Sequence, residues 1–328
     1  MAEKISIKGI WKVLKKAFSG FSDDKVMKLS ASLAYYTVFS IGPMIIVIIY
    51  IAGLMYGREA VEGTIFGQIK GLVGASAADQ IQEMIKSAAL NKEGKFAFVI
   101  GIVTLIIGAT GVFAEIQDSI NQIWNLKPKP KKGWLKMLTD RLLSFSVILS
   151  LGFILLVSLL LNGVLELLMD RLQKTFPNVT VVMVYITNLL ITFLVISTLF
   201  AVIFKVLPDA IIKWKDVIVG SMVTAVLFMA GKFAITFYIG STDIGGTYGA
   251  AGSLVVLLLW VYYSSVIVYF GAEFTKAYAA CYGSPIHPSA IAVWVKNIEV
   301  EEKGGSLQQQ EEKKQEHNDK TGDHIKVT

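Results

Sequence analysis

Charged side chains inside long apolar segments are the first candidates for chemistry, because burying a charge in such a segment is costly unless it serves a function. Glu115, Lys232 and Glu273 are residues of this kind. At a rise of about 1.5 Å per helical residue, both glutamates lie at the cytoplasmic boundary of their segments. Lys232 lies about 10 Å inside the opposite edge. Its ammonium either extends to the outer headgroups or faces a polar cavity, where it would attract an anionic group. For Glu115 the favoured alternative is the solvated end of an amphipathic helix.

Interruptions of the helical backbone are a second kind of candidate. Gly42 and Pro43 fall near the middle of the first apolar segment, where proline removes a backbone hydrogen bond. Gly108 and Gly111 fall past the middle of the second segment. Breaks at this depth suit a substrate-binding or hinging bundle, and the alternative is close helix packing through small residues.

Residue types that bind metals or act as nucleophiles are scarce. Cys281 is the single cysteine, and the histidines His287, His317 and His324 all follow the last apolar segment. A disulfide framework, a cysteine-rich metal centre and a buried histidine site are therefore excluded. We predict no catalytic residue, no metal and no cofactor, and we expect that the protein is not an enzyme.

The elements that must position these candidates follow from composition. Hydrophobic residues make up 54% of the 328 residues, charged residues only 17%, and the mean hydropathy is +0.59. A soluble domain has about 25% charged residues. The apolar residues form blocks of roughly 19 to 27, enough for a helix to cross a bilayer, with none of the short alternating blocks of a membrane β-barrel. We predict an all-α integral membrane protein, a bundle of six transmembrane helices at 31–55, 96–114, 142–168, 179–204, 217–239 and 251–275.

Lys and Arg residues indicate the orientation. The first segment, the 115–141 and 205–216 loops and the tail hold seven, six, three and seven of them, and the other loops hold five, two and none. The positive-inside rule then places both termini in the cytoplasm. The basic residues are almost all lysines strung between apolar blocks, which favours membrane lipids, including anionic lipids of the cytoplasmic leaflet, over nucleic acid as partners. These patterns predict no particular oligomeric state.

Three regions follow from these boundaries. Residues 1–30 form a basic amphipathic segment, whose helix either lies in the lipid interface or packs on the cytoplasmic ends of the bundle. Residues 31–280 form the transmembrane domain, with two short amphipathic helices expected in the outer loop 56–95. Residues 281–328 form a charged, largely disordered cytoplasmic tail.

Several short motifs occur in order between about residues 28 and 280. They are Ala34-Tyr35-Tyr36, Phe39-Ser40-Ile41-Gly42-Pro43, Gly111-Val112-Phe113, Asn121-Gln122-Ile123-Trp124, Leu207-Pro208-Asp209, Tyr248-Gly249-Ala250-Ala251, Leu259-Trp260-Val261-Tyr262 and Gly271-Ala272-Glu273. Together they resemble the YihY/BrkB family of bacterial inner-membrane proteins, some of whose members were once labelled ribonuclease BN. The resemblance implies a six-helix inner-membrane protein and supplies no catalytic residues.

The function that we expect is transport, in the manner of a flippase, of a lipid or another envelope-related molecule. The candidate substrate-pathway residues are Tyr35, Glu115, Asn121, Lys232, Tyr248 and Glu273. The alternative is a membrane scaffold or envelope assembly factor that moves no substrate. A ribonuclease is not expected, because clustered carboxylates or a histidine acid–base would be needed on the cytoplasmic face.

Overall fold

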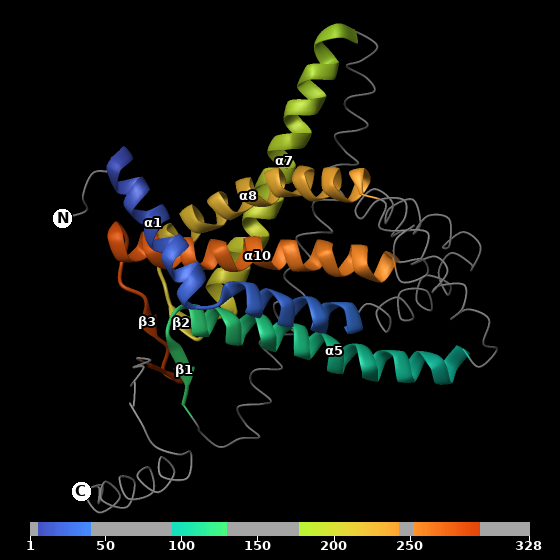
Figure 1. Cartoon of the computed structure of the whole chain (residues 1–328), viewed down its shortest axis with the longest axis horizontal. Helices are drawn as coiled ribbons and strands as arrows, with labels where there is room; N and C mark the ends of the chain where they lie inside the picture. Colours follow the sequence, from blue (N-terminus) through green and yellow to red (C-terminus); the bar gives the residue numbers. More distant parts are fainter. Residues whose placement is uncertain (1–5, 41–93, 130–176, 243–251, 296–328) are drawn as a thin grey trace, which may run out of the picture. The chain divides into compact units, whose positions relative to one another are not determined.

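The structure is a computed structural model that describes residues 6–40, 94–129, 177–242 and 252–295. Long helices dominate these residues (Figure 1). The described residues up to Trp294 belong to one compact unit. The predicted start of the tail at residue 281 therefore falls inside the compact unit.

Four long helices carry most of the apolar residues that the structure describes. They are α5 (Gly94–Ile123), α7 (Pro177–Val206), α8 (Trp214–Ser241) and α10 (Gly252–Cys281). Within the described part of the chain, three stretches are long and apolar enough to cross a membrane: Ile186–Val206, Trp214–Ser241 and Leu254–Cys281. These coincide with the last three predicted spans.

The remaining predicted spans are covered in part. Helix α5 contains the predicted 96–114 span and continues nine residues beyond it. Residues 26–40 are helical and include the start of the first span. The rest of that span, the 142–168 span and almost all of the 56–95 loop lie outside the described residues.

Local sequence signals explain where the shorter helices begin and end. Helix α1 (Ile7–Asp23) starts after Ser6, whose hydroxyl accepts a hydrogen bond from the Gly9 amide at 3.2 Å. Lys25, at φ 54°, separates α1 from helix 26–40. Asn125, at φ 57°, follows the end of α5, and asparagine tolerates this left-handed conformation better than most residues.

Helices α8 and α10 run side by side and pack through glycine and threonine (Figure 1). A Cβ placed on Gly220 would lie 1.9 Å from the Thr275 hydroxyl, and one placed on Gly271 would lie 2.1 Å from the Thr224 hydroxyl. Each glycine therefore leaves room for a threonine side chain of the facing helix, which packs against it. Small residues let helix backbones approach closely, which is how membrane helices gain packing energy.

Four short strands in the described part of the chain depart from the predicted all-α fold. Strand β1 (Leu126–Pro128) pairs antiparallel with β4 (Ala292–Trp294), and β2 (Ala210–Ile211) pairs antiparallel with β3 (His287–Pro288). Strands of two or three residues are too short to show the alternating pattern that identifies a strand in a sequence. They join the segments that follow α5, α7 and α10.

Candidate functional site

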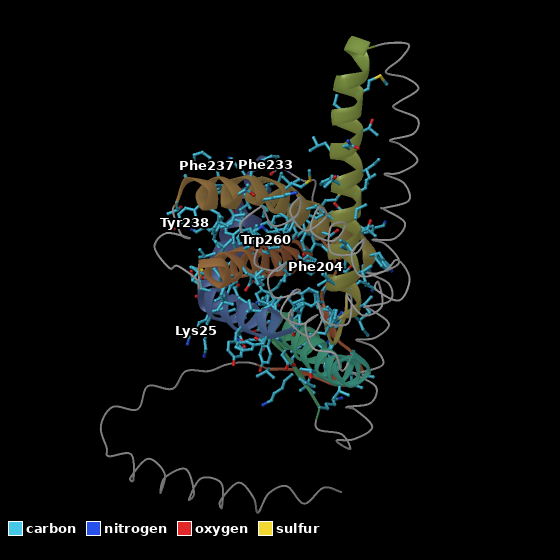
Figure 2. The ribbon with its side chains drawn as sticks, turned by 90° about the vertical axis from the view of Figure 1, so that its right-hand side faces the viewer. Lys25, Phe204, Phe233, Phe237, Tyr238 and Trp260 are labelled. Atoms are coloured by element: carbon cyan, nitrogen blue, oxygen red, sulfur yellow. The ribbon has the colours of Figure 1, made fainter. Side chains whose placement is uncertain are left out.

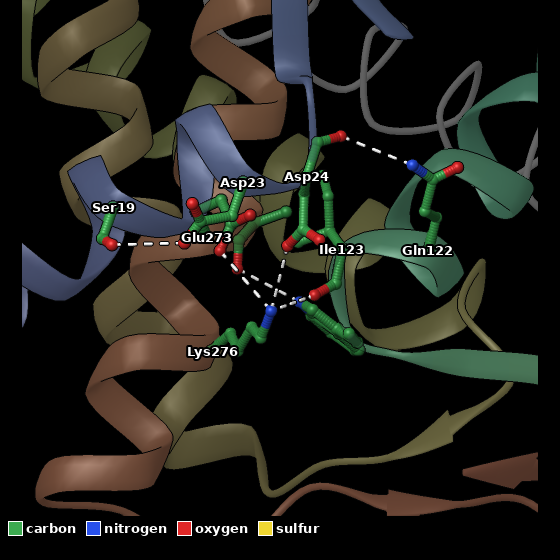
Figure 3. Close-up of polar contacts among 9 residues, drawn as sticks. Ser19, Asp23, Asp24, Gln122, Ile123, Glu273 and Lys276 are labelled. Carbon is green, nitrogen blue, oxygen red and sulfur yellow. Dashed lines mark hydrogen bonds and ion pairs between the residues drawn. The ribbon is translucent and has the colours of Figure 1, made fainter. Parts of the chain in front are cut away.

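A charged cluster lies where α1, α5 and α10 meet (Figure 3). Lys276 Nζ donates a hydrogen bond to Asp24 Oδ2 at 3.1 Å and lies 3.8 Å from Glu273 Oε2. The same ammonium donates to the backbone carbonyl of Ile123, at the end of α5. We call Asp24, Glu273 and Lys276, with this carbonyl, the Glu273 cluster.

Burial is uneven within the Glu273 cluster. The side chain of Glu273 is 2% exposed, that of Asp24 17% and that of Lys276 29%. Glu273 Oε1 accepts no hydrogen bond from any residue that the structure describes. A buried carboxyl oxygen without a hydrogen-bond partner is costly, because it has lost its hydrogen bonds to water. Two carboxylates thus share one ammonium, which is the part of the cluster nearest to solvent.

The neighbouring helices hold the Glu273 cluster in place through specific contacts. Trp124 Nε1 donates to the Ala272 carbonyl at 3.1 Å, which joins α5 to α10 one residue before Glu273. A Cβ on Gly20 would lie 2.4 Å from Glu273 Oε2, so α1 approaches the carboxylate only because residue 20 is glycine. Gln122 Nε2 donates weakly, at 3.4 Å, to the Asp24 carbonyl.

A second buried network, which we call the Asp209 network, joins α5 to the turn after α7. Gln117 Nε2 donates to Asp209 Oδ1 at 3.1 Å, and Asn121 Nδ2 donates to Asp209 Oδ2 at 3.0 Å. The backbone amide of Asp209 in turn donates a hydrogen bond to Asn121 Oδ1 at 2.8 Å. All three side chains are buried. Because both carboxylate oxygens have donors, this network is satisfied where the Glu273 cluster is not.

Asp216 anchors the end of α10. It lies in the first turn of α8, and its Oδ2 accepts a hydrogen bond from the Ser284 amide at 3.0 Å. A Cβ on Gly283 would lie 2.2 Å from Asp216 Oδ1, so a larger residue would displace this contact. A carboxylate at a helix N-terminus is also favoured by the helix dipole. This end of the molecule therefore holds three separate polar arrangements.

The last two turns of α5 and Trp124, which follows them, organise both networks. Gln117 and Asn121 reach Asp209, whereas the Ile123 carbonyl and Trp124 reach α10. Residues that stand 88 or more positions apart in the sequence are brought together in this way. Two of the candidates predicted from sequence, Asn121 and Glu273, lie in these networks.

The other described candidates lie elsewhere. Glu115 is half-buried and accepts from the Ser119 hydroxyl at 3.5 Å. Tyr35 is 58% exposed and has its ring against Phe39, with ring centroids 4.6 Å apart. Tyr248, Gly42 and Pro43 lie outside the described residues.

Lys232 is exposed on α8 and makes no hydrogen bond or ion pair with another residue of the described ranges. Phe233 and Phe237 project from the same part of this helix, and both are largely exposed (Figure 2). The structure does not bring Lys232 to either polar network. Its two alternatives, an ammonium reaching headgroups or one facing a cavity, both stay open.

Gly108 and Gly111 do not interrupt their helix. Helix α5 is continuous from Gly94 to Ile123, through both glycines. A Cβ on Gly108 would lie 2.7 Å from the Ser40 hydroxyl, and one on Gly111 would lie 3.2 Å from the Tyr36 ring. The packing alternative therefore describes these glycines, because they admit side chains of helix 26–40 against α5.

Four residues of the networks were not among the sequence candidates: Asp24, Gln117, Asp209 and Lys276. Lys276 follows Glu273 by three residues, a spacing that places both on one helix face and could have suggested the pair. Asp209 stands in one of the motifs, but its partner is 88 residues away. Within the described residues, no group of three or more His, Cys, Asp and Glu side chains is placed to hold a metal ion.

Comparison with known proteins gives a consistent result. Residues 17–289 match the family model described as virulence factor BrkB. The chain is 26% identical over 280 residues to a UPF0761 membrane protein of Alcanivorax borkumensis, covering 83% of this chain and 61% of the relative. It is 26% identical to one of Haemophilus influenzae, covering 77% and 90%. A relative from Xanthomonas axonopodis pv. citri is 25% identical, covering 79% of this chain and 59% of its own length.

The chain thus spans about three fifths of the length of the Alcanivorax and Xanthomonas relatives. No solved structure matches it.

Proposed function

The chain belongs to the virulence factor BrkB family, and from this premise we propose that it is a multi-pass inner-membrane protein that transports a lipid or another envelope-related molecule. Both termini are cytoplasmic in this proposal. The protein acts on its substrate without a catalytic step, and nucleic acid is not a partner. The Glu273 cluster is the part of the molecule that responds to the substrate.

The observation that supports this role most directly is the unpartnered Oε1 of the buried Glu273. A scaffold gains nothing from an incompletely satisfied carboxylate in an apolar helix, because an uncharged side chain would pack there at lower cost. Ionisable residues that face the interior of a membrane helix bundle often mark substrate or ion routes, and Glu273 is buried among α1, α5 and α10. The incomplete pairing is therefore better explained by a function than by stability.

Lys276 is the residue through which an anionic substrate can act on the Glu273 cluster. Its side chain is 29% exposed while its ammonium binds the Asp24 carboxylate. An anionic headgroup that pairs with Lys276 competes with Asp24 for this single cation. Such competition loosens the contact between α1 and α10, because Asp24 and Lys276 belong to these two parts of the chain.

A scaffold or envelope assembly factor is the second candidate. The fully paired Asp209 network and the close glycine–threonine contact between α8 and α10 favour it, because both hold the helices in one arrangement. A protein that only holds its partners needs no moving part. The two candidates therefore differ in whether the Glu273 cluster matters beyond folding.

Reconstitution into liposomes tests the proposal. The full-length protein is incorporated with fluorescent phospholipids or labelled lipid-linked precursors, and movement between leaflets is followed by bleaching of the outer leaflet. Transport predicts protein-dependent movement that Glu273→Gln and Lys276→Met reduce by tenfold or more. Lys232→Leu is measured in the same series, since Lys232 is the pathway candidate on α8.

The matched control is Asp23→Asn. It removes one negative charge beside the cluster, but Asp23 is exposed and its carboxylate accepts from the Ser19 hydroxyl. This variant keeps the wild-type rate. Gel filtration and thermal unfolding verify that each variant is folded. Absence of movement with every labelled lipid and precursor would leave the scaffold as the better explanation.

A further inference from the structure

Helix α1 has three faces with different surroundings. The first face contains Gly9, Val13, Ala17 and Gly20, which recur every three to four residues and so lie on one side of the helix. Val13 and Ala17 are buried against Phe274 and Ala277 of α10. The two glycines lie against the Tyr282 hydroxyl and the Glu273 carboxylate. This face holds α1 to the last turns of α10.

The second face of α1 is apolar and exposed. Ile10, Trp11 and Phe18 are 46%, 70% and 62% exposed in the part of the chain that the structure describes. Phe18 also touches α10, with ring centroids 4.9 Å from Phe270. Large apolar side chains gathered on one face of an amphipathic helix are typical of a contact with a membrane or a partner.

The third face of α1 is strongly basic. Lys8, Lys12, Lys15 and Lys16 are all exposed and lie between the apolar face and the face packed on α10. The only acidic residue of α1 is Asp23, at its end. Because the lysines adjoin the exposed aromatic side chains, any surface that covers the aromatic face also meets four positive charges.

The position of α1 along α10 fits the boundary of a bilayer. The apolar stretch Leu254–Cys281 has 28 residues, or about 42 Å of helix, whereas the hydrocarbon core is about 30 Å thick. The stretch is therefore about 12 Å longer than the hydrocarbon, and the cytoplasmic boundary expected near Glu273 puts this excess in its last turns. Contacts of α1 run from Phe270 to Tyr282, in the last three turns of α10 and the residue that follows them. Trp11 and Phe18 thus lie near the depth of the lipid headgroups.

We propose that α1 is a lipid-binding helix: Trp11 and Phe18 insert at the headgroup level, and Lys8, Lys12, Lys15 and Lys16 bind the phosphates of anionic phospholipids. The two orientations expected from the sequence, lying in the interface and packing on the bundle, are then one arrangement, because different faces of the helix perform them. This inference does not depend on transport. It concerns the lipid that surrounds the protein rather than a transported substrate.

Fluorescence quenching in liposomes tests the inference on the full chain. Cys281 is replaced by alanine, Trp11→Cys is introduced, and the new cysteine is labelled with a small fluorophore. The liposomes contain spin-labelled phosphatidylcholine or spin-labelled phosphatidylglycerol in an unlabelled phosphatidylcholine background. We expect both lipids to quench the fluorophore, and the anionic lipid to quench it several-fold more efficiently at low salt.

A second set of variants assigns the charge effect. Replacing Lys8, Lys12, Lys15 and Lys16 together by glutamine makes the two quenchers equally efficient. The matched control replaces four exposed lysines outside α1 by glutamine, namely Lys25, Lys28, Lys213 and Lys215. It retains the preference for the anionic quencher. An unquenched fluorophore, equal quenching by both lipids with the native lysines, or equal loss in both lysine variants would each overturn the inference.

Discussion

Asn121 and Asp209 exchange two hydrogen bonds, although 88 residues separate them. The amide of Asn121 donates to the Asp209 carboxylate at 3.0 Å, and the backbone amide of Asp209 donates to Asn121 Oδ1 at 2.8 Å. The side chain of Asn121 therefore serves as donor and acceptor at once. No other side chain of this size and shape has both groups in one plane.

Exchanging the two side chains tests this relationship. Asn121→Asp alone places two carboxylates together and should lower the free energy of unfolding by about 3 kcal/mol. Asp209→Asn added to it supplies an amide donor for the new carboxylate, which still accepts from the backbone amide of residue 209. The double variant should recover more than half of the loss, measured as the unfolding midpoint in detergent. If the two effects simply add, the residues do not interact as described.

A second prediction concerns the balance of charge in the Glu273 cluster. Lys276→Met leaves the Asp24 and Glu273 carboxylates without their shared cation. The cost should be about 1 to 2 kcal/mol, less than for a fully buried pair, because the lysine is partly exposed. Adding Glu273→Gln removes the excess negative charge and should restore most of the stability.

Thermal unfolding in detergent measures both of these variants. Lys25→Met is the control, because Lys25 is exposed at the turn after α1 and its loss should not move the midpoint. A double variant no more stable than Lys276→Met would contradict the proposed charge balance.

A third prediction concerns the contact between α8 and α10. Gly220→Ala and Gly271→Ala each place a methyl group within about 2 Å of a threonine hydroxyl of the facing helix. Overpacking of this kind should cost about 1 to 3 kcal/mol. Gly240→Ala makes the same change on α8 where nothing lies within 4 Å of the added Cβ, and it should be neutral. Equal unfolding midpoints for all three variants would mean that the helices do not approach as closely as described.

A fourth prediction concerns the segment that follows α10. A chain ending at Val295 retains β3 and β4 and should keep the unfolding midpoint of the full-length protein. A chain ending at Pro285 loses both strands, together with the buried Ile286 and Ala292, and should unfold at a lower temperature. Gel filtration and thermal unfolding compare the two. If the chain ending at Pro285 unfolded at a higher temperature than the chain ending at Val295, β3 and β4 would not belong to the compact unit.

Much of the fold followed from local patterns. The helical stretches at 179–204, 217–239 and 251–275 were expected at nearly the boundaries of α7, α8 and α10, because hydropathy and helix length are properties of a continuous segment. The short strands were not expected. Their pairing depends on where the ends of distant helices come together. The sequence of a strand of two or three residues does not indicate this position.

The candidate site was predictable only in part. Glu273 stood out because it is a charge inside an apolar segment, and Asn121 because it belongs to a motif. Lys232 satisfied the first criterion equally well, yet it lies exposed on α8, away from both networks. The sequence could not separate these cases, since burial depends on which helix covers a side chain.

By itself, the sequence determined the class of this protein, an apolar helical membrane chain with few charges inside its apolar segments, because the cost of placing each residue in a bilayer is nearly additive along the chain. Only the tertiary structure decided which charges meet. Asp24 contacts Lys276, which is 252 residues away in the sequence, and Asn121 contacts Asp209, which is 88 residues away. Hydrogen bonds act over about 3 Å, so their partners are chosen by helix packing and not by distance along the sequence.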